Sequence, residues 1–258
     1  MTLGLIVNQG DSFNLTIYIA SHKKFDFKPT SHFQLIQVNG ARNPHFTDVT
    51  DDTGDNISLK NNRYSELTAL YWIWKNDSHS DYVGLCHYRR YFKLHKGLFD
   101  HWKRKYRYDS IPYDEIAVSP WVENALREGK VFVTMPMHSH HETIGEQYCR
   151  AHVKEDFEIM HDVLGNKYPE YLKDWDQVMN GNHIFAYNMS IMSKERFDDY
   201  CSWLFGILFA VEEKVPPKED SFQNRTFGFM SERLFNVYLQ HQHFPVVERP
   251  YCFINDLK

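Results

Sequence analysis

The sequence predicts a single α/β domain with a mainly parallel central sheet flanked by helices. Apolar strand-like runs alternate along the chain with segments whose apolar residues recur at helical spacing. The chain has 258 residues, of which 42% are hydrophobic and 24% charged, so it can bury one large core. We find no internal repeat, low-complexity tract or linker, and we therefore expect one domain spanning residues 1–258.

The first half of the chain reads strand, strand, loop, helix, strand. LTIYIA (15–20) and QLIQV (34–38) are β-rich runs that stop at polar turn residues. A helix is expected from Ser65 to Asn76, because its apolar residues at i, i+3, i+4 and i+7 share one face. DYVGLCHYRRYF (81–92) follows as a buried strand, and VFVTM (131–135) is another strand. The basic, aromatic stretch 95–107 is expected to be a surface excursion.

The second half of the chain continues the alternation. One helix is expected from Ile144 to Val163 and a strand over HIFAYNMSIM (183–192). Two further helices are expected over 195–210 and 228–240, each with an apolar stripe.

Composition excludes several classes of protein. The formal charge of −5 argues against a broad nucleic-acid-binding surface. The four cysteines are far apart and form no CxxC pair, so reduced thiols are expected. The amino-terminal stretch has no basic leader, and no run approaches the roughly 20 apolar residues of a membrane span. We expect a cytoplasmic protein.

A cluster of cationic and aromatic side chains ends the strand 81–92. His87, Tyr88, Arg89 and Arg90 follow its buried core, and ligands bind at the carboxyl ends of strands in open α/β sheets. Adjacent arginines repel each other unless an anion lies beside them, and a guanidinium group offers a planar fork of donors to phosphate oxygens. The pattern favours an anion site, with a structural ion pair as the alternative.

Two other groups of polar residues could each form a functional site or have an ordinary structural role. HSHH (138–141) with Glu142 could form a metal site or a solvated loop, because metal ligands need convergent geometry. Tyr148, His152 and Asp156 are spaced to share one stripe of the expected helix 144–163, where a general base or a surface ion pair would both fit.

Polar residues of the last helix and of two loops each fit both a functional and a purely structural interpretation. Glu232 and Asn236 have i, i+4 spacing and could serve a site or an ordinary polar face. GDNIS (54–58) is a turn or a loop that grips a base or ribose, and Asn182 and Asn188 suit turns or hydroxyl recognition. No dinucleotide, Walker, G-x-S-x-G or H-E-x-x-H motif is present.

Several segments together carry a family resemblance. IYIASHKKF, DDTGDNISLKNNRYSELTALYWIWKN, DYVGLCHYRRYF, EQYCRAHVKEDF, NMSIMSKERFDDYCSWLF and RTFGFMSERLFNVYL run from about residue 16 to 240. They resemble a bacterial domain family of unknown function found in capsular and exopolysaccharide glycosyltransferases. The resemblance implies a GT-A-like, Rossmann-like fold, with a nucleotide-sugar half over about 15–135 and an acceptor half over about 136–258.

The resemblance also implies how such an enzyme would differ from metal-dependent relatives. In that fold the comparable strand usually ends in Asp-x-Asp, which holds a divalent metal on the donor diphosphate, and His87-Tyr88-Arg89 stands there in this chain. Fixed cations can neutralise a leaving diphosphate in place of a metal. We therefore predict no metal site and no cofactor, with a divalent ion such as Mn²⁺ or Mg²⁺ as the alternative.

Site residues are predicted on the same basis. The donor site is expected to comprise His22, Lys23, Asp55, Asn56, Glu66, His87, Tyr88, Arg89 and Arg90. The acceptor side is expected to comprise Asn182, His183 and Asn188. For inverting transfer, Asp156 is the first candidate for the base and Glu232 the second, with His152 as a further catalytic candidate.

The expected activity is transfer of a sugar, UDP-galactose or UDP-galactofuranose being the favoured donors, to a glycan or lipid-linked oligosaccharide. Peripheral contact with the inner membrane through the basic-aromatic stretch near Trp102 is a further expectation. A non-catalytic glycan- or nucleotide-binding module is the alternative, and a metal-dependent hydrolase that uses HSHH and Glu142 is a third hypothesis.

Overall fold

The computed structural model describes residues 13–98 and 100–255. The first residues of the amino-terminal stretch, on which the absence of a signal peptide was predicted, lie outside this range.

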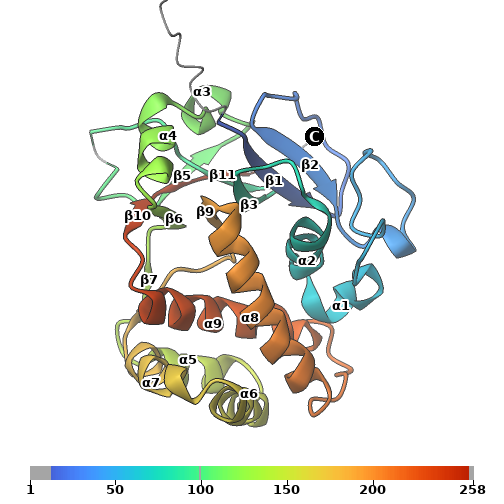
Figure 1. Cartoon of the computed structure of the whole chain (residues 1–258), viewed down its shortest axis with the longest axis vertical. Helices are drawn as coiled ribbons and strands as arrows, with labels where there is room; N and C mark the ends of the chain where they lie inside the picture. The colour runs from blue at the N-terminus through green and yellow to red at the C-terminus, as the bar shows by residue number, and fades with distance from the viewer. Residues whose placement is uncertain (1–12, 99, 256–258) are drawn as a thin grey trace, which may run out of the picture.

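A single curved sheet forms the centre of the molecule (Figure 1). Six of its strands lie side by side in the order β2-β1-β3-β9-β6-β10. The strands β4, β11 and β5 extend the sheet from the end of β3. In the first series β9 is antiparallel to both of its neighbours, and the other neighbouring pairs are parallel. The strands are β1 (Leu15–Ser21), β2 (Phe33–Gln37), β3 (Tyr82–His87), β4 (Arg90–Phe92), β5 (Lys105–Tyr108), β6 (Val131–Thr134), β9 (Ser190–Ser193), β10 (Val246–Arg249) and β11 (Tyr251–Ile254). The predicted α/β class with a mostly parallel, helix-flanked sheet is confirmed.

Helices cover both faces of the sheet, and a further layer of helices lies outside the first (Figure 1). On one face lie α2 (Leu67–Asn76), α8 (Lys194–Glu212) and α9 (Thr226–Gln242), with α1 (Asn61–Tyr64) beside them. The outer layer is α5 (Ile144–Ala151), α6 (Lys154–Lys167) and α7 (Leu172–Met179). These three helices lie in the chain between β7 (Met137–His138) and β8 (His183–Ile184), which pair as a short antiparallel two-stranded sheet. The other face carries α3 (Tyr113–Ile116) and α4 (Pro120–Arg127), and short 3₁₀ turns complete the chain at Gly40–Arg42, Ser58–Lys60, Pro169–Tyr171 and Gln223–Arg225.

Alternation along the strands divides the interior into two cores. Tyr18 of β1 and Val83 of β3 point to the core shared with α2, α8 and α9, whereas Ile19 and Cys86 point to the core under α3 and α4. Gly84 faces the core under α3 and α4, where an added Cβ would be 2.8 Å from Ile191 Cγ1. The tight central strand therefore depends on a residue without a side chain.

Three predicted elements are wrong in their continuity. The expected strand 81–92 is two antiparallel strands, since β3 ends at His87 and β4 begins at Arg90. The expected helix 144–163 is two helices, because His152 has an extended backbone (φ −133°) and Val153 is the N-cap of α6, which begins at Lys154. Carboxylates in the first turn of α6 suit a helix amino terminus, and Asp156 there binds partners from a remote loop. The expected strand 183–192 is also broken, since β8 ends at Ile184 and β9 begins at Ser190.

The stretch 95–107 was expected to be a surface excursion, and this prediction is wrong at the carboxyl end of the stretch. Lys105–Tyr108 forms β5 and pairs in parallel with β11. All four cysteines are free, as expected. Within 13–98 and 100–255, no helix combines the length and apolar character that a bilayer crossing requires.

Candidate active site

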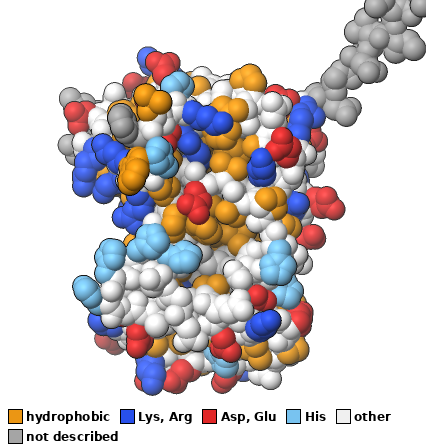
Figure 2. All heavy atoms as spheres, turned by 90° about the vertical axis from the view of Figure 1, so that its left-hand side faces the viewer, with side chains coloured by type: hydrophobic (Ala, Val, Ile, Leu, Met, Phe, Trp, Pro, Cys, Tyr) orange, Lys and Arg blue, Asp and Glu red, His pale blue; other side chains and the backbone are white. Residues whose placement is uncertain are grey.

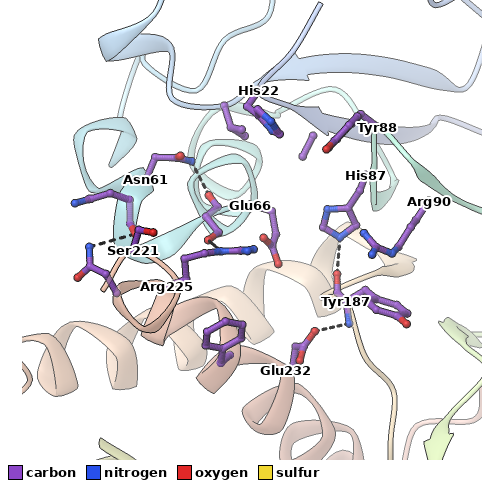
Figure 3. Close-up of a pocket in the computed structure, with 16 residues that line it drawn as sticks. His22, Asn61, Glu66, His87, Tyr88, Arg90, Tyr187, Ser221, Arg225 and Glu232 are labelled. Atoms are coloured by element: carbon purple, nitrogen blue, oxygen red, sulfur yellow. Dashed lines mark hydrogen bonds between the residues drawn. The ribbon is translucent and has the colours of Figure 1, made fainter. Parts of the chain in front are cut away.

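A pocket of about 720 Å³ opens where β1 and β3 end, between the sheet and the start of α9 (Figure 3). We call it the central pocket. Both halves of the chain contribute to it, since α1 and β3 supply one wall and the segment before β9 together with α9 supplies the other. Its lining residues are Ala20, His22, Val38, Asn61, Asn62, Ser65, Glu66, His87, Tyr88, Arg90, Tyr187, Ser221, Asn224, Arg225, Phe229 and Glu232.

Two guanidinium groups point into the central pocket from opposite sides (Figure 3). Arg90 lies over the ring of Tyr187 at 4.7 Å, and its buried Nε has no hydrogen-bond partner. Arg225 donates from Nε to Ser65 Oγ at 3.0 Å. Neither forms an ion pair with any carboxylate in 13–98 or 100–255. A buried donor without a partner calls for an acceptor, and here the acceptor would face two cations.

Arg89 does not join them, and the expectation that both adjacent arginines face one ligand is wrong. Its guanidinium donates to the carbonyl oxygen of Ile254 at 2.8 Å and to that of Asn255, and it lies over the ring of Phe253. The chain turns between β3 and β4 at this point, so consecutive side chains leave in different directions. Arg89 therefore holds β11 against the turn.

Two carboxylates, Glu66 and Glu232, line the same pocket (Figure 3). Glu66 accepts a hydrogen bond from Asn188 Nδ2 at 2.7 Å. Glu232 accepts from the Tyr187 amide at 2.7 Å and from Arg233 at 3.1 Å. Burial raises the pKa of Glu232, the nearby Glu66 adds to the rise, and Arg233, the Tyr187 amide and Arg90 oppose it. A carboxylate with a raised pKa is a stronger base once it is ionised.

His87 closes the floor of the pocket at the end of β3. Its Nε2 lies 2.6 Å from the Tyr187 carbonyl oxygen, which can only accept, so Nε2 carries the proton and Nδ1 is left as an acceptor. Burial lowers the pKa of His87, and the neighbouring cations Arg90 and Arg225 lower it further against the opposing effect of Glu66. The imidazole is thus neutral at pH 7.

The backbone around the pocket is held in left-handed conformations at three residues other than glycine: Ser65 (φ 52°), Tyr187 (φ 77°) and Asn188 (φ 51°). Each such residue costs of order 1–3 kcal/mol, and it persists because the surrounding contacts offset that cost. The constraint on Asn188 comes from its side chain, which donates to Glu66 and to the Gly228 carbonyl and accepts from Ser231 at 2.9 Å. This bonding explains why the predicted strand 183–192 is interrupted at the pocket.

The remaining donor-side predictions divide into two groups. His22 and Tyr88 line the central pocket with their rings 5.1 Å apart, and partial burial with the nearby Lys23 and Arg225 lowers the pKa of His22. Lys23 is exposed and does not line the pocket.

Asp55 and Asn56 lie outside the pocket lining as well. Asp55 accepts from the Tyr71 hydroxyl at 3.0 Å, and Asn56 bonds to its own loop, so the turn interpretation of GDNIS matches the structure.

Asp156 and His152 also lie outside the central pocket lining. Asp156 is buried and paired with Lys218, with Nζ at 2.9 and 2.7 Å from its two oxygens. His152 stacks on Phe229 at 4.0 Å, and burial together with Arg233 lowers the pKa of His152 to about 4. The predicted common helix stripe does not exist, since the helix ends between them.

Of the expected acceptor residues, Asn182 lies between α7 and β8, and His183 is the first residue of β8, which pairs with β7. His183 lines a second hollow of about 470 Å³ with Phe185 and Phe244. The third acceptor-side candidate, Asn188, acts beside the central pocket through Glu66.

Among the described residues, the HSHH histidines and Glu142 are not arranged as a set of metal ligands. Glu142 is held by two hydrogen bonds from Arg150, at 2.8 and 2.6 Å. Through the described part of the chain, no three His, Cys, Asp or Glu side chains converge as metal ligands would.

Sequence reasoning missed several lining residues, above all Arg225 and Tyr187. Arg225 is the last residue of the loop VPPKEDSFQNR (215–225) and immediately precedes the last helix, and a basic residue at the entry to a helix is an unusual choice there. Tyr187 carries no local signal, because its role rests on its backbone groups, which bond to His87 and Glu232.

Comparison with known proteins places this chain in a family. A family model described as "Domain of unknown function (DUF4422)" matches residues 16–243. The chain belongs to this family. Among solved structures, this DUF4422 domain is similar to the apo structure of the bifunctional glycosyltransferase WbbM, with a TM-score of 0.87 and 27% identity. The match covers 95% of this chain and 46% of the WbbM chain, so the domain spans about half of that protein. No curated protein matches.

Proposed function

We propose that this DUF4422 domain is a glycosyltransferase that moves a sugar from a nucleoside-diphosphate donor to a glycan hydroxyl in the central pocket. The observation that carries the proposal is the pair of guanidinium groups, Arg90 and Arg225, that face the pocket without a carboxylate partner among the described residues. The likeness to a bifunctional glycosyltransferase supports the reaction class. A GT-A-like arrangement fits the pocket's place at the ends of β1 and β3.

In the proposed reaction the two arginines bind the diphosphate. The bond between the anomeric carbon and the diphosphate oxygen breaks, and negative charge grows on that oxygen. Fixed donors aimed at such a charge lower the barrier without reorganising. Arg90 and Arg225 would therefore take the role of a divalent metal, and we propose transfer without one.

Glu232 is the base that we propose, in place of Asp156. Its carboxylate lines the pocket, whereas that of Asp156 is occupied by Lys218. Glu232 would take the proton from the acceptor hydroxyl as the acceptor oxygen attacks the anomeric carbon, which gives inversion. Glu66 and the neutral His87, with its free Nδ1, are placed to bind hydroxyl groups of the sugar.

For the donor we propose UDP-galactose or UDP-galactofuranose, and for the acceptor a growing capsular, exopolysaccharide or lipopolysaccharide glycan, free or lipid-linked. Aromatic rings of the pocket, Tyr187 and Phe229, could stack on sugar or base faces.

Calorimetry with UDP and UMP tests the anion site. Removing one charge-assisted contact should cost about 1.5–3 kcal/mol, so Arg90→Ala and Arg225→Ala should each weaken UDP binding about 10- to 100-fold. Their effect on UMP should be smaller, because it lacks the second phosphate. Arg89→Ala is the matched control, since Arg89 is turned onto β11. Equal losses in all three variants would remove the basis of the proposal.

Transfer is tested with radiolabelled UDP-galactose and UDP-galactofuranose on membrane-derived glycan acceptors, with and without excess EDTA. Glu232→Gln should abolish transfer and retain UDP binding. Activity lost in EDTA and restored by Mn²⁺ would contradict the metal-independent form. Glycan or nucleotide binding with neither transfer nor donor hydrolysis would favour the non-catalytic module instead.

A further inference from the structure

The loop between β4 and β5 presents two large apolar side chains to solvent. Leu98 is 86% exposed and Trp102 is 81% exposed, the highest values among the exposed large apolar side chains of the described residues. In Figure 1 this loop forms the left-hand edge of the molecule, next to the short grey trace. Large apolar side chains that are exposed on one loop lower the solubility of a protein unless they meet an apolar or interfacial environment.

The base of this loop is built rigidly from buried charges. Asp100 is 6% exposed and accepts from the Gly97 amide at 2.8 Å and from Arg249 Nη2 at 2.5 Å. Lys93, also buried, lies 3.2 Å from Asp100 and 2.9 Å from Glu115. These bonds hold the two ends of the loop tip in place, so the exposed side chains are displayed from a fixed support.

Cations surround the two apolar side chains. Lys96, Lys103, Arg104, Lys105 and Arg107 lie on the loop or on β5. None of them forms an ion pair with a carboxylate of the described residues, and several rest on aromatic rings, Lys96 on Trp121 at 4.3 Å and Lys103 on Tyr106 at 4.5 Å. Figure 2 faces this side and shows Lys and Arg side chains gathered around apolar ones in its upper part. The patch is positive on a chain whose formal charge is −5.

The basic patch continues to the mouth of the central pocket. Phe253 of β11 has Lys105 and Arg107 on its ring at 5.4 and 5.5 Å, and Arg90 lies 5.5 Å from the same ring. Burial raises the pKa of Tyr187 to about 12, and the nearby Arg104 and Arg90 oppose that rise, so Arg104 also lies close to a pocket residue.

We propose that residues 95–98 and 100–104, together with β5, form a docking surface for an anionic membrane, with Trp102 and Leu98 entering the interface and the surrounding cations contacting phosphate headgroups. Trp at the headgroup level and clustered Lys and Arg are the two features that give a peripheral protein its membrane affinity. The charge of the patch favours a lipid surface over a partner protein of ordinary composition. Docking in this way sets the central pocket beside the membrane surface.

Vesicle co-sedimentation of the whole chain tests this, with phosphatidylcholine vesicles with or without phosphatidylglycerol and with no nucleotide present. The partition coefficient should be much higher for the anionic vesicles and should fall as salt is raised. Lys103→Ala and Lys105→Ala should each lower it about fivefold, the equivalent of about 1 kcal/mol per basic residue. Trp102→Ala should lower it as well, and the residual binding of that variant should be more sensitive to salt.

Matched controls distinguish docking through this surface from an effect of net charge or of non-specific hydrophobic adsorption. Lys167→Ala with Lys173→Ala removes two exposed cations from the outer helical layer, and Leu59→Ser removes an exposed Leu elsewhere. These controls should bind as the unmodified chain does. Equal binding to neutral vesicles, no binding at all, or equal losses in the controls would overturn the proposal. Because no donor is present, none of these results bears on whether the central pocket transfers sugar.

Discussion

The ion pair between Asp156 and Lys218 allows a sharp test of whether Asp156 serves the fold or the reaction. The side chains are 5% and 15% exposed, and Asp156 also accepts from the Thr226 hydroxyl at 3.3 Å. Removing one partner of a buried pair costs about 3–5 kcal/mol, because the other charge stays buried. Lys218 can reach water in part, so we take the lower end, about 3 kcal/mol, for Asp156→Asn. In a chain of this size that is a fall in Tm of about 6–12 °C.

The measurement is urea and thermal unfolding of Asp156→Asn, Lys218→Met and the double variant, together with the UDP affinity of each. We expect the double variant to lose less than the sum of the single losses, since the pair is removed as a unit. UDP affinity should stay within about twofold of the unmodified chain at a temperature where the variant is folded. The exposed helix pair Lys154 and Glu158, whose side chains are 65% and 58% exposed, is the control, and its removal should cost much less stability than removal of the buried pair. Native stability with abolished transfer in Asp156→Asn would refute this reasoning and restore Asp156 as the base.

Three further outcomes follow from the packing of the chain. Gly84→Ala should destabilise the protein by about 1–3 kcal/mol in urea unfolding, because the new methyl would lie 2.8 Å from Ile191; an unchanged midpoint would show that the strands can part at no cost. The pKa of His152 is lowered to about 4 by its burial, so its stabilising effect is complete above its unfolded pKa of about 6.5 and is lost as the pH falls from there towards 4. His152→Phe should flatten that acid limb, and a retained limb would assign it to another group. Cys149 is the partly accessible thiol among four, so Cys149→Ser should abolish slow labelling of the native protein by a thiol reagent, whereas persistent labelling would mean that a buried cysteine opens to solvent.

Local pattern was enough to predict most of the fold. The spacing of Leu67, Leu70 and Trp74 predicts α2, and the run before His87 predicts β3, because both depend on which face or side of an element is apolar. Local pattern did not predict the backbone conformation where it is determined by residues distant in the sequence. The break at His152 and the left-handed turn at Tyr187 and Asn188 depend on side chains from the 218–236 region, which no window of neighbouring residues contains.

The candidate site was predictable only in part for a related reason. β3 ends at His87, and Tyr88 and Arg90 follow at the turn into β4. The sequence alone determined that these residues lie at one edge of the sheet, because strand ends are set by apolar periodicity. Tertiary structure decided that Arg89 turns onto β11 while Arg225 arrives from the far side of the pocket. The direction of a side chain at a turn, and the proximity of residues that are distant in the sequence, are set by the packing of whole helices and strands. No single segment of the sequence carries that information.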